Sequence, residues 1–283
     1  MTVSITACSL VRSGYGWLPT AVNWRLASYL TPTREQQNKI DEHLESLLEW
    51  HRTVELPRYA TLLERIAAHP ALAADAAGQP AAIGMADLQR WRAQAEEVWP
   101  PLAQRLAAPV AEIAVTLDAG QLAEIRAGIR ARQRKILAEH GGDDPARRVA
   151  HRVERWESRL ERLLGELTDR QRALIAARVA EMPANERWWQ ARFDWQQGFV
   201  DELERLVREK ATADQAAPRV RVWLDRWLQP GDDAARALAE DSADDAQRLI
   251  VELLGSAEPA QRAHARTFLG QLANDFRELS RGT

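Results

Sequence analysis

The sequence contains a single cysteine, Cys8, among 283 residues. One thiol excludes an intramolecular disulfide and any metal site built from several cysteines. No apolar run inside the chain approaches the ~20 residues that a transmembrane helix requires. The formal net charge is only −3, which argues against a generally basic nucleic-acid-binding protein. The composition therefore excludes several classes of protein without indicating an activity.

Motifs that carry catalysis are also missing. No two of the six histidines have the i,i+4 spacing that lets two imidazoles on one helix face share a metal. His43 and His51 are eight residues apart, too far to form such a pair. There is no nucleophile elbow and no phosphate-binding glycine loop. We interpret the three aspartate pairs as helix caps rather than acid–base pairs; they are Asp143-Asp144, Asp232-Asp233 and Asp244-Asp245. The sequence thus gives no support for catalysis, a cofactor or a metal site.

Helical periodicity extends over almost the whole chain, because apolar residues recur at steps of three and four. It predicts an all-α fold, a multi-helix bundle of roughly eight to ten helices, kinked at internal prolines. We expect kinks or breaks at Pro57, Pro100, Pro101 and Pro109, which fall inside helical patterns. The apolar stripe of the first long helix is expected to comprise Ile40, Leu44, Leu47, Leu48, His51 and Val54.

Three helix starts have the pattern of a capping box, in which a short side chain and a glutamine three residues later each bond the other's backbone amide. These starts are Thr33–Gln36, Asp118–Gln121 and Thr168–Gln171. A looser start lies at Ser256–Pro259. Because the spacing of these starts is uneven, a bundle is favoured over a solenoid of fixed period, which is kept as the alternative.

Tryptophan is unusually frequent, with 11 residues. The segment 185–199 predicts a candidate aromatic binding face for a peptide, a glycan strand or a partner helix. Its residues are Trp188, Trp189, Phe193, Trp195 and Phe199. The alternative is that these rings fill the core of the bundle. Further upstream, Trp17 and Trp24 are candidates for a position at the level of lipid headgroups.

The four residues Ile5-Thr6-Ala7-Cys8 fit a bacterial lipobox, in which an aliphatic residue and two small residues precede the cysteine that is acylated. A signal peptide also needs a basic region and an apolar stretch of ~7–15 residues upstream. Only MTVSITA precedes Cys8. Either Met1 is not the native start, or Cys8 is an ordinary cysteine.

The segment 31–67 resembles a known family, most closely at Trp50-His51-Arg52 followed by Glu55-Leu56-Pro57-Arg58-Tyr59. The resemblance is to an uncharacterised family of Gram-negative putative lipoproteins (domain of unknown function 6279). It implies a secretion signal ending in a lipobox, which corresponds here to Ile5–Cys8. It implies a cellular address and no biochemical activity.

These observations lead to one hypothesis and two alternatives. Residues 1–7 are interpreted as the remnant of a lipoprotein signal peptide, 8–30 as a lipid-anchored tether with a short first helix, and 31–283 as an all-α domain. We expect a structural or interaction protein attached through Cys8 to the periplasmic face of the outer membrane, with an envelope protein or glycan as partner and no nucleic acid. One alternative is a cytosolic helical protein-binding module, if Met1 is the true start. The other is a hydrolase of envelope material, which would require a pocket lined by His43, His51 and Glu55.

Overall fold

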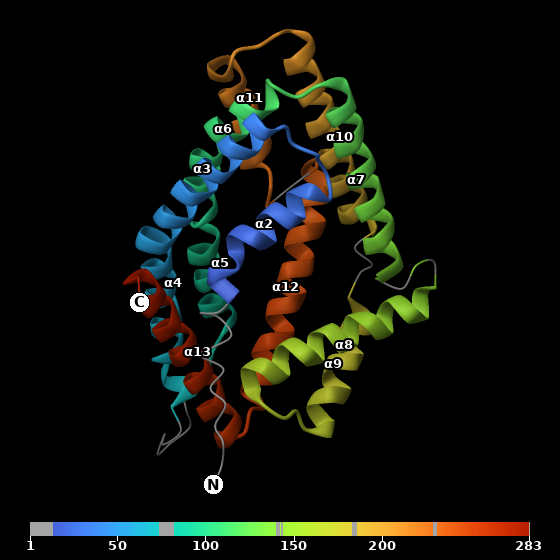
Figure 1. Cartoon of the computed structure of the whole chain (residues 1–283). Helices are drawn as coiled ribbons and strands as arrows, with labels where there is room; N and C mark the ends of the chain where they lie inside the picture. Colours follow the sequence, from blue (N-terminus) through green and yellow to red (C-terminus); the bar gives the residue numbers. More distant parts are fainter. Residues whose placement is uncertain are drawn as a thin grey trace.

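The computed structural model describes residues 14–73, 82–139, 142, 144–182, 186–228 and 231–282. All regular secondary structure in these residues is helical, which confirms the all-α fold class (Figure 1). The α-helices are α2 (Leu18–Ala27), α3 (Arg34–Trp50), α4 (Leu56–Ala67), α5 (Met85–Glu96), α6 (Trp99–Ala114), α7 (Ala119–Glu139), α8 (Pro145–Leu164), α9 (Asp169–Glu181), α10 (Glu186–Arg208), α11 (Ala213–Asp225), α12 (Asp233–Gly255) and α13 (Pro259–Ser280). A π-helical turn, η1 (His51–Glu55), joins α3 to α4, and a short 3₁₀ turn, η2 (Pro70–Leu72), follows α4.

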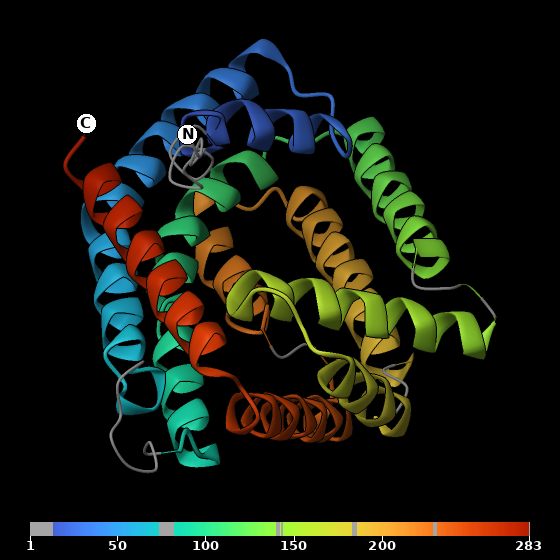
Figure 2. The same ribbon diagram turned by 90° about the horizontal axis from the view of Figure 1, so that it is seen from below.

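The buried apolar side chains form two clusters. The first lies between α6, α10 and α11, with residues such as Ala107, Leu206 and Val220. The second joins α8, α9, α12 and α13, with residues such as Leu164 and Leu253. Figure 1 shows α11 at one end of the molecule and α8, α9 and the start of α13 toward the other. The rod formed by α3, η1 and α4 runs between the two ends, and α13 packs along α4 in both ribbon views (Figures 1 and 2).

The three predicted capping boxes are confirmed. In the box of α3, the Thr33 hydroxyl accepts from the Gln36 amide and the Gln36 side chain accepts from the Thr33 amide; the boxes at Asp118 and Thr168 repeat this arrangement. The start of α13 is capped at Glu258, close to the looser start expected from the sequence.

The aspartate pairs have mixed outcomes. Asp144 caps α8 and Asp232 caps α12, as predicted, while Asp143 lies outside the described residues. The prediction for Asp244-Asp245 is wrong, because both residues lie inside α12, where Asp245 pairs with Arg248 at 2.7 Å. α12 is already capped at Asp232, so a second start is not needed.

Two pairs of capping glutamines join helix starts that are distant in the sequence. The carboxamides of Gln36 and Gln121 bond each other in both directions, at 3.1 and 2.7 Å. The carboxamides of Gln171 and Gln261 do the same, at 2.9 Å each way. All four side chains are buried. Each pair therefore fixes two helix N-termini against each other, α3 to α7 and α9 to α13.

The prolines interrupt the helices less than expected. Pro100 and Pro101 occupy the first turn of α6, where a missing N–H costs no hydrogen bond. α6 continues through Pro109 instead of breaking there. At Pro57 the rod also continues, but through the π turn, in which the Leu56 amide donates to the carbonyl of His51, five residues back. This wider turn accommodates the proline ring and its absent N–H.

The π turn also corrects the expected apolar stripe of the first long helix. A π turn adds one residue, and each residue of a helix advances the face by about 100°. Val54, expected on the buried face, is consequently turned outward and is 44% exposed. Glu55 and Leu56 are buried instead, at 1% and 2% exposure.

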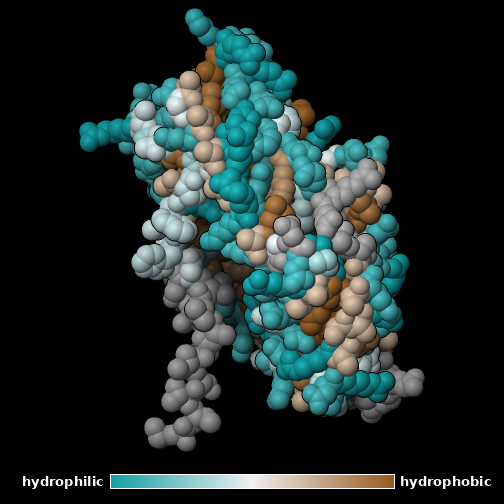
Figure 3. All heavy atoms as spheres, turned by 90° about the vertical axis from the view of Figure 1, so that its right-hand side faces the viewer, coloured by the Kyte–Doolittle hydropathy of each residue, from teal (hydrophilic) through white to brown (hydrophobic). Residues whose placement is uncertain are grey.

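The surface seen in Figure 3 is dominated by hydrophilic side chains, with hydrophobic ones confined to narrow strips. Such a distribution is typical of amphipathic helices that direct their apolar faces inward.

Candidate functional site

The residues Trp50–Arg52 and Glu55–Tyr59, which carry the family resemblance and are called the motif below, lie in and beside the π turn. Here four rings from three parts of the chain form a column. The Tyr15 hydroxyl lies 3.0 Å from Nδ1 of His51 and 3.2 Å from the carbonyl oxygen of Leu48. The imidazole of His51 contacts the ring of Tyr59 edge to face, with centroids 5.5 Å apart, and Tyr59 contacts Phe276 of α13 in the same way at 6.0 Å. The motif therefore joins the segment before α2, the rod and the last helix.

Tyr15 and Phe276 were not singled out by the sequence reasoning. They lie 36 residues before His51 and 217 residues after Tyr59, so no local pattern could pair them with the motif.

Glu55 is the buried charge of this site. Its side chain is 1% exposed, and Oε1 accepts a hydrogen bond from Nη1 of Arg58 at 2.9 Å. Within the described part of the chain, Oε2 is buried without a hydrogen-bond partner. A buried carboxylate with one unsatisfied oxygen destabilises the fold. Strained arrangements of this kind and π turns both occur frequently at functional sites.

Burial sets the protonation states around Glu55. Burial lowers the pKa of His51, against the opposing effect of Glu55. Burial, followed by the negative charge of Glu55, raises the pKa of Tyr59 to about 12. Burial also raises the pKa of Tyr15. A neutral imidazole beside hydroxyls that hold their protons more strongly than usual positions groups by hydrogen bonding, and does not form an activated nucleophile.

The remaining motif residues face other neighbours. The guanidinium of Arg105, on α6, lies 4.8 Å from the ring centroid of Trp50. Arg52 forms an ion pair with Glu49 at 2.5 Å. Leu56 belongs to the buried core. These motif residues therefore contact other residues of the protein.

The motif also borders a groove of about 380 Å³ between α4 and the end of α5. The lining residues are Pro57, Arg58, Tyr59, Thr61, Leu62, Arg65, Gln94, Glu97 and Val98. Arg65 and Glu97 are exposed and form no ion pair with the described residues. The groove therefore presents two guanidinium groups, one carboxylate, an amide and two hydroxyls to an occupant.

This groove is not the pocket that the hydrolase alternative requires. His43, His51 and Glu55 do not line it. His43 instead contacts Glu112 of α6 at 3.0 Å, on another side of the rod from the ring column. The described geometry therefore gives the hydrolase hypothesis no added support.

The five residues of the candidate aromatic face lie together on α10, but they pack largely against one another and against α11. Phe193 and Trp195 are buried, each at 8% exposure. Trp195 stacks on Phe199 at 6.4 Å and contacts Trp227 edge to face at 5.3 Å. The indoles of Trp188 and Trp189 contact each other at 4.8 Å and are half-buried. The core alternative accounts for Phe193 and Trp195.

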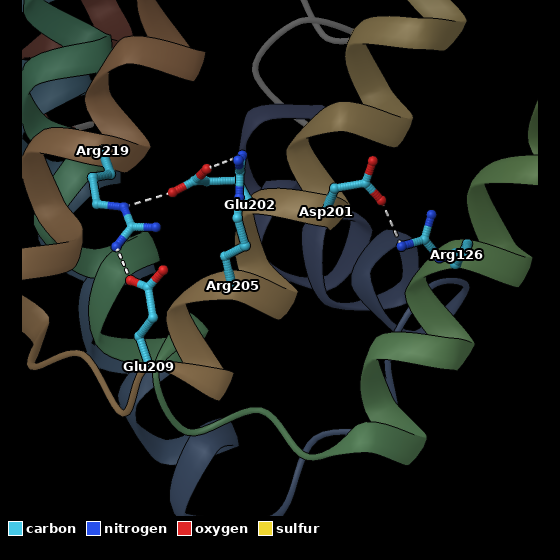
Figure 4. A network of polar contacts seen from close by, with 6 residues as sticks. All are labelled: Arg126, Asp201, Glu202, Arg205, Glu209 and Arg219. Atoms are coloured by element: carbon cyan, nitrogen blue, oxygen red, sulfur yellow. Dashed lines mark hydrogen bonds and ion pairs between the residues drawn. The ribbon is translucent and has the colours of Figure 1, made fainter.

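The charged residues between α7, α10 and α11 also satisfy one another. Arg126 of α7 pairs with Asp201 of α10 at 2.8 Å. Arg219 of α11 pairs with Glu202 at 2.6 Å and with Glu209 at 2.5 Å (Figure 4). This network fixes α10 on two sides and does not present free charges to a ligand.

Cys8 lies outside the described residues. In the part of the chain that is described, no three His, Cys, Asp or Glu side chains are arranged to hold a metal ion. None of the described helices has the length and apolarity needed to cross a membrane.

No curated protein and no solved structure matches the chain. The model of a family of unknown function, DUF6279, matches residues 28–224, which include the rod, the π turn and the groove. The match spans more than half of the sequence, and the chain therefore belongs to this family of unknown function.

Proposed function

We propose that the protein is a lipid-anchored envelope protein with an interaction role, attached through Cys8 and binding its partner in the groove beside the motif. The observation that carries the interaction role is the composition of the groove wall. Pro57, Arg58 and Tyr59 of the motif form one part of it, next to the charges of Arg65 and Glu97, which have no ion-pair partner among the described residues. Charged groups without an internal partner are available to an external one.

The chemistry of the wall indicates the class of partner. Arg58 and Arg65 are seven residues apart on α4, which places their Cα atoms about 10 Å apart along the helix. Guanidinium groups favour carboxylates and phosphates, because their donors match these anions in pairs. Glu97 adds an acceptor for an N–H or ammonium group. We therefore propose an envelope protein or glycan that carries carboxylate groups.

The proposed address depends on the lipobox Ile5–Cys8. Acylation of Cys8, followed by Ser9 rather than aspartate, would direct the protein to the periplasmic face of the outer membrane. If Met1 is the true start, the alternative is a cytosolic helical binding module that uses the same groove.

The address is tested by the mass of the N-terminal peptide from protein expressed at its native locus. A peptide that begins at Cys8 and carries diacylglycerol and an amide-linked acyl chain supports the anchor. A peptide that retains Met1 and a free thiol refutes it.

The groove is tested by photo-crosslinking in cells from a probe at Leu62, in the groove wall. The matched control is a probe at Leu137, which is 50% exposed on α7. A defined adduct from Leu62 alone, lost in Arg65→Ala, is the expected result. Identical adducts from both positions would refute the assignment.

A further inference from the structure

α2 places two large apolar side chains on the side that faces away from the protein, in addition to its half-buried apolar stripe. Trp17, which caps α2, and Trp24 are 68% and 76% exposed, and their separation of seven residues places them on one side of the helix. Toward α3, by contrast, α2 presents the polar Asn23, which bonds Asp41 at 2.9 Å and Gln37 at 3.2 Å. No residue of α2 is fully buried. A surface helix normally turns its large apolar side chains to the protein, so these two indoles are positioned for something outside it.

Charge distinguishes this part of the chain from the rest. Residues 1–34 contain three arginines, Arg12, Arg25 and Arg34, and no aspartate or glutamate, although the chain has 41 acidic residues. A segment without carboxylates is complementary to an anionic surface, and indole favours the headgroup level of a bilayer.

The outward side of α2 favours a lipid surface over a protein groove. Between the two indoles it carries the small exposed residues Thr20 and Ala21. A helix that fills a protein groove typically uses a continuous stripe of large anchors at i, i+3, i+4 and i+7. Two large indoles separated by small residues instead fit shallow insertion among headgroups.

We infer that α2 is an interfacial helix that lies on an anionic lipid bilayer, with Trp17 and Trp24 inserted at the headgroup level. This deepens the proposed membrane attachment but rests on α2 itself, and it does not require an acyl chain on Cys8.

The test uses the full chain with Cys8→Ser, which cannot be acylated, in sedimentation with vesicles of phosphatidylethanolamine and phosphatidylglycerol. Binding to these vesicles, weaker binding to pure phosphatidylcholine, and a loss of about tenfold or more in Trp17→Ala/Trp24→Ala are expected. Trp227→Ala removes another exposed indole, at 38% exposure just after the end of α11, and should bind like the parent. Unchanged helical circular dichroism in each variant establishes that the fold is retained.

The inference is overturned if the Cys8→Ser chain does not bind anionic vesicles, or if the double variant binds as well as the parent. Self-association that is abolished by Trp17→Ala/Trp24→Ala, without vesicle binding, would assign the surface to a second copy of the chain and also overturn it. Acylated Cys8 in cells without intrinsic vesicle binding would refute this inference alone. A free Cys8 thiol with vesicle binding would refute only the acyl anchor.

Discussion

The reciprocal glutamine pairs provide the sharpest test of how the helix starts are held together. Replacing Gln171 by alanine removes both hydrogen bonds to Gln261 and the bond that Gln171 Oε1 accepts from the Thr168 amide. Gln261 keeps its contacts with the carbonyl of Glu166 at 2.8 Å and with the amide of Glu258 at 3.0 Å. The loss is therefore confined to three hydrogen bonds in a buried position.

The cost follows from these three bonds. A buried hydrogen bond contributes about 1 kcal/mol net, and loss of a capping interaction costs about 1 kcal/mol. We expect Gln171→Ala to lower the free energy of unfolding by about 3 kcal/mol. Gln215 provides a matched control, because it forms the same capping box with Thr212 but is exposed and bonds no glutamine in the described part of the chain. Gln215→Ala should cost about 1 kcal/mol.

Urea unfolding followed by circular dichroism measures both values. The double variant Gln171→Ala/Gln261→Ala should be less destabilised than the sum of its single variants, by about 1 to 2 kcal/mol, because the pair can be lost only once. Equal costs for Gln171→Ala and Gln215→Ala, together with additive effects in the double variant, would show that the pairing contributes nothing.

Three further predictions concern packing, pH and surface charge. Gly128→Ala should lower the free energy of unfolding in urea by about 1 to 3 kcal/mol, because a Cβ there would lie 2.9 Å from the carbonyl oxygen of residue 28. Gly270→Ala, in open space within α13, should raise it by about 0.5 to 1 kcal/mol. Changes of the same sign in both variants would refute the packing of Gly128 against residue 28. Burial lowers the pKa of His51 below 6.5, so on acidification the imidazole is protonated in the unfolded state before it is protonated in the folded state. The Tm should therefore fall as the pH drops below about 6.5, and the Tm of His51→Gln should fall less steeply over the same range. Arg126→Ala, which loses the ion pairs with Asp201 and Glu204, should cost about 1 kcal/mol or less, and less still at high salt. A larger, salt-independent cost would indicate a packing role.

The sequence predicted best those features that depend on residues close together in the chain. A capping box needs only two residues three positions apart, and the boxes at Thr33, Asp118 and Thr168 are all present. The same local reasoning failed at Asp244-Asp245, because a pair of aspartates is equally compatible with the exposed side of a helix. Only the cap at Asp232 and the length of α12 distinguish the two.

Features that depend on tertiary contacts were not accessible in this way. Pro57 indicated an irregularity, but not that a π turn would absorb it and bury Glu55. The ring column needs Tyr15 and Phe276, which approach His51 and Tyr59 only in the folded chain. Periodicity also could not separate a binding face from a core face on α10, because aromatic rings serve both.

The contacts of the last helix, α13, distinguish a bundle from a solenoid. Similar starts recur at 117–121, 167–171, 211–215 and 257–261, and their glutamines follow one another at intervals of 44 to 50 residues. These starts begin α7, α9, α11 and α13, so every second helix in this part of the chain begins alike, as in a solenoid. In a solenoid each unit contacts only its neighbours. Here α13 returns to pack along α4, and Arg277 pairs with Glu64, 213 residues away, at 2.5 Å. Local sequence patterns thus set the repeated helix starts, and the long-range contacts of α13 with the rod close the helices into a bundle around the motif.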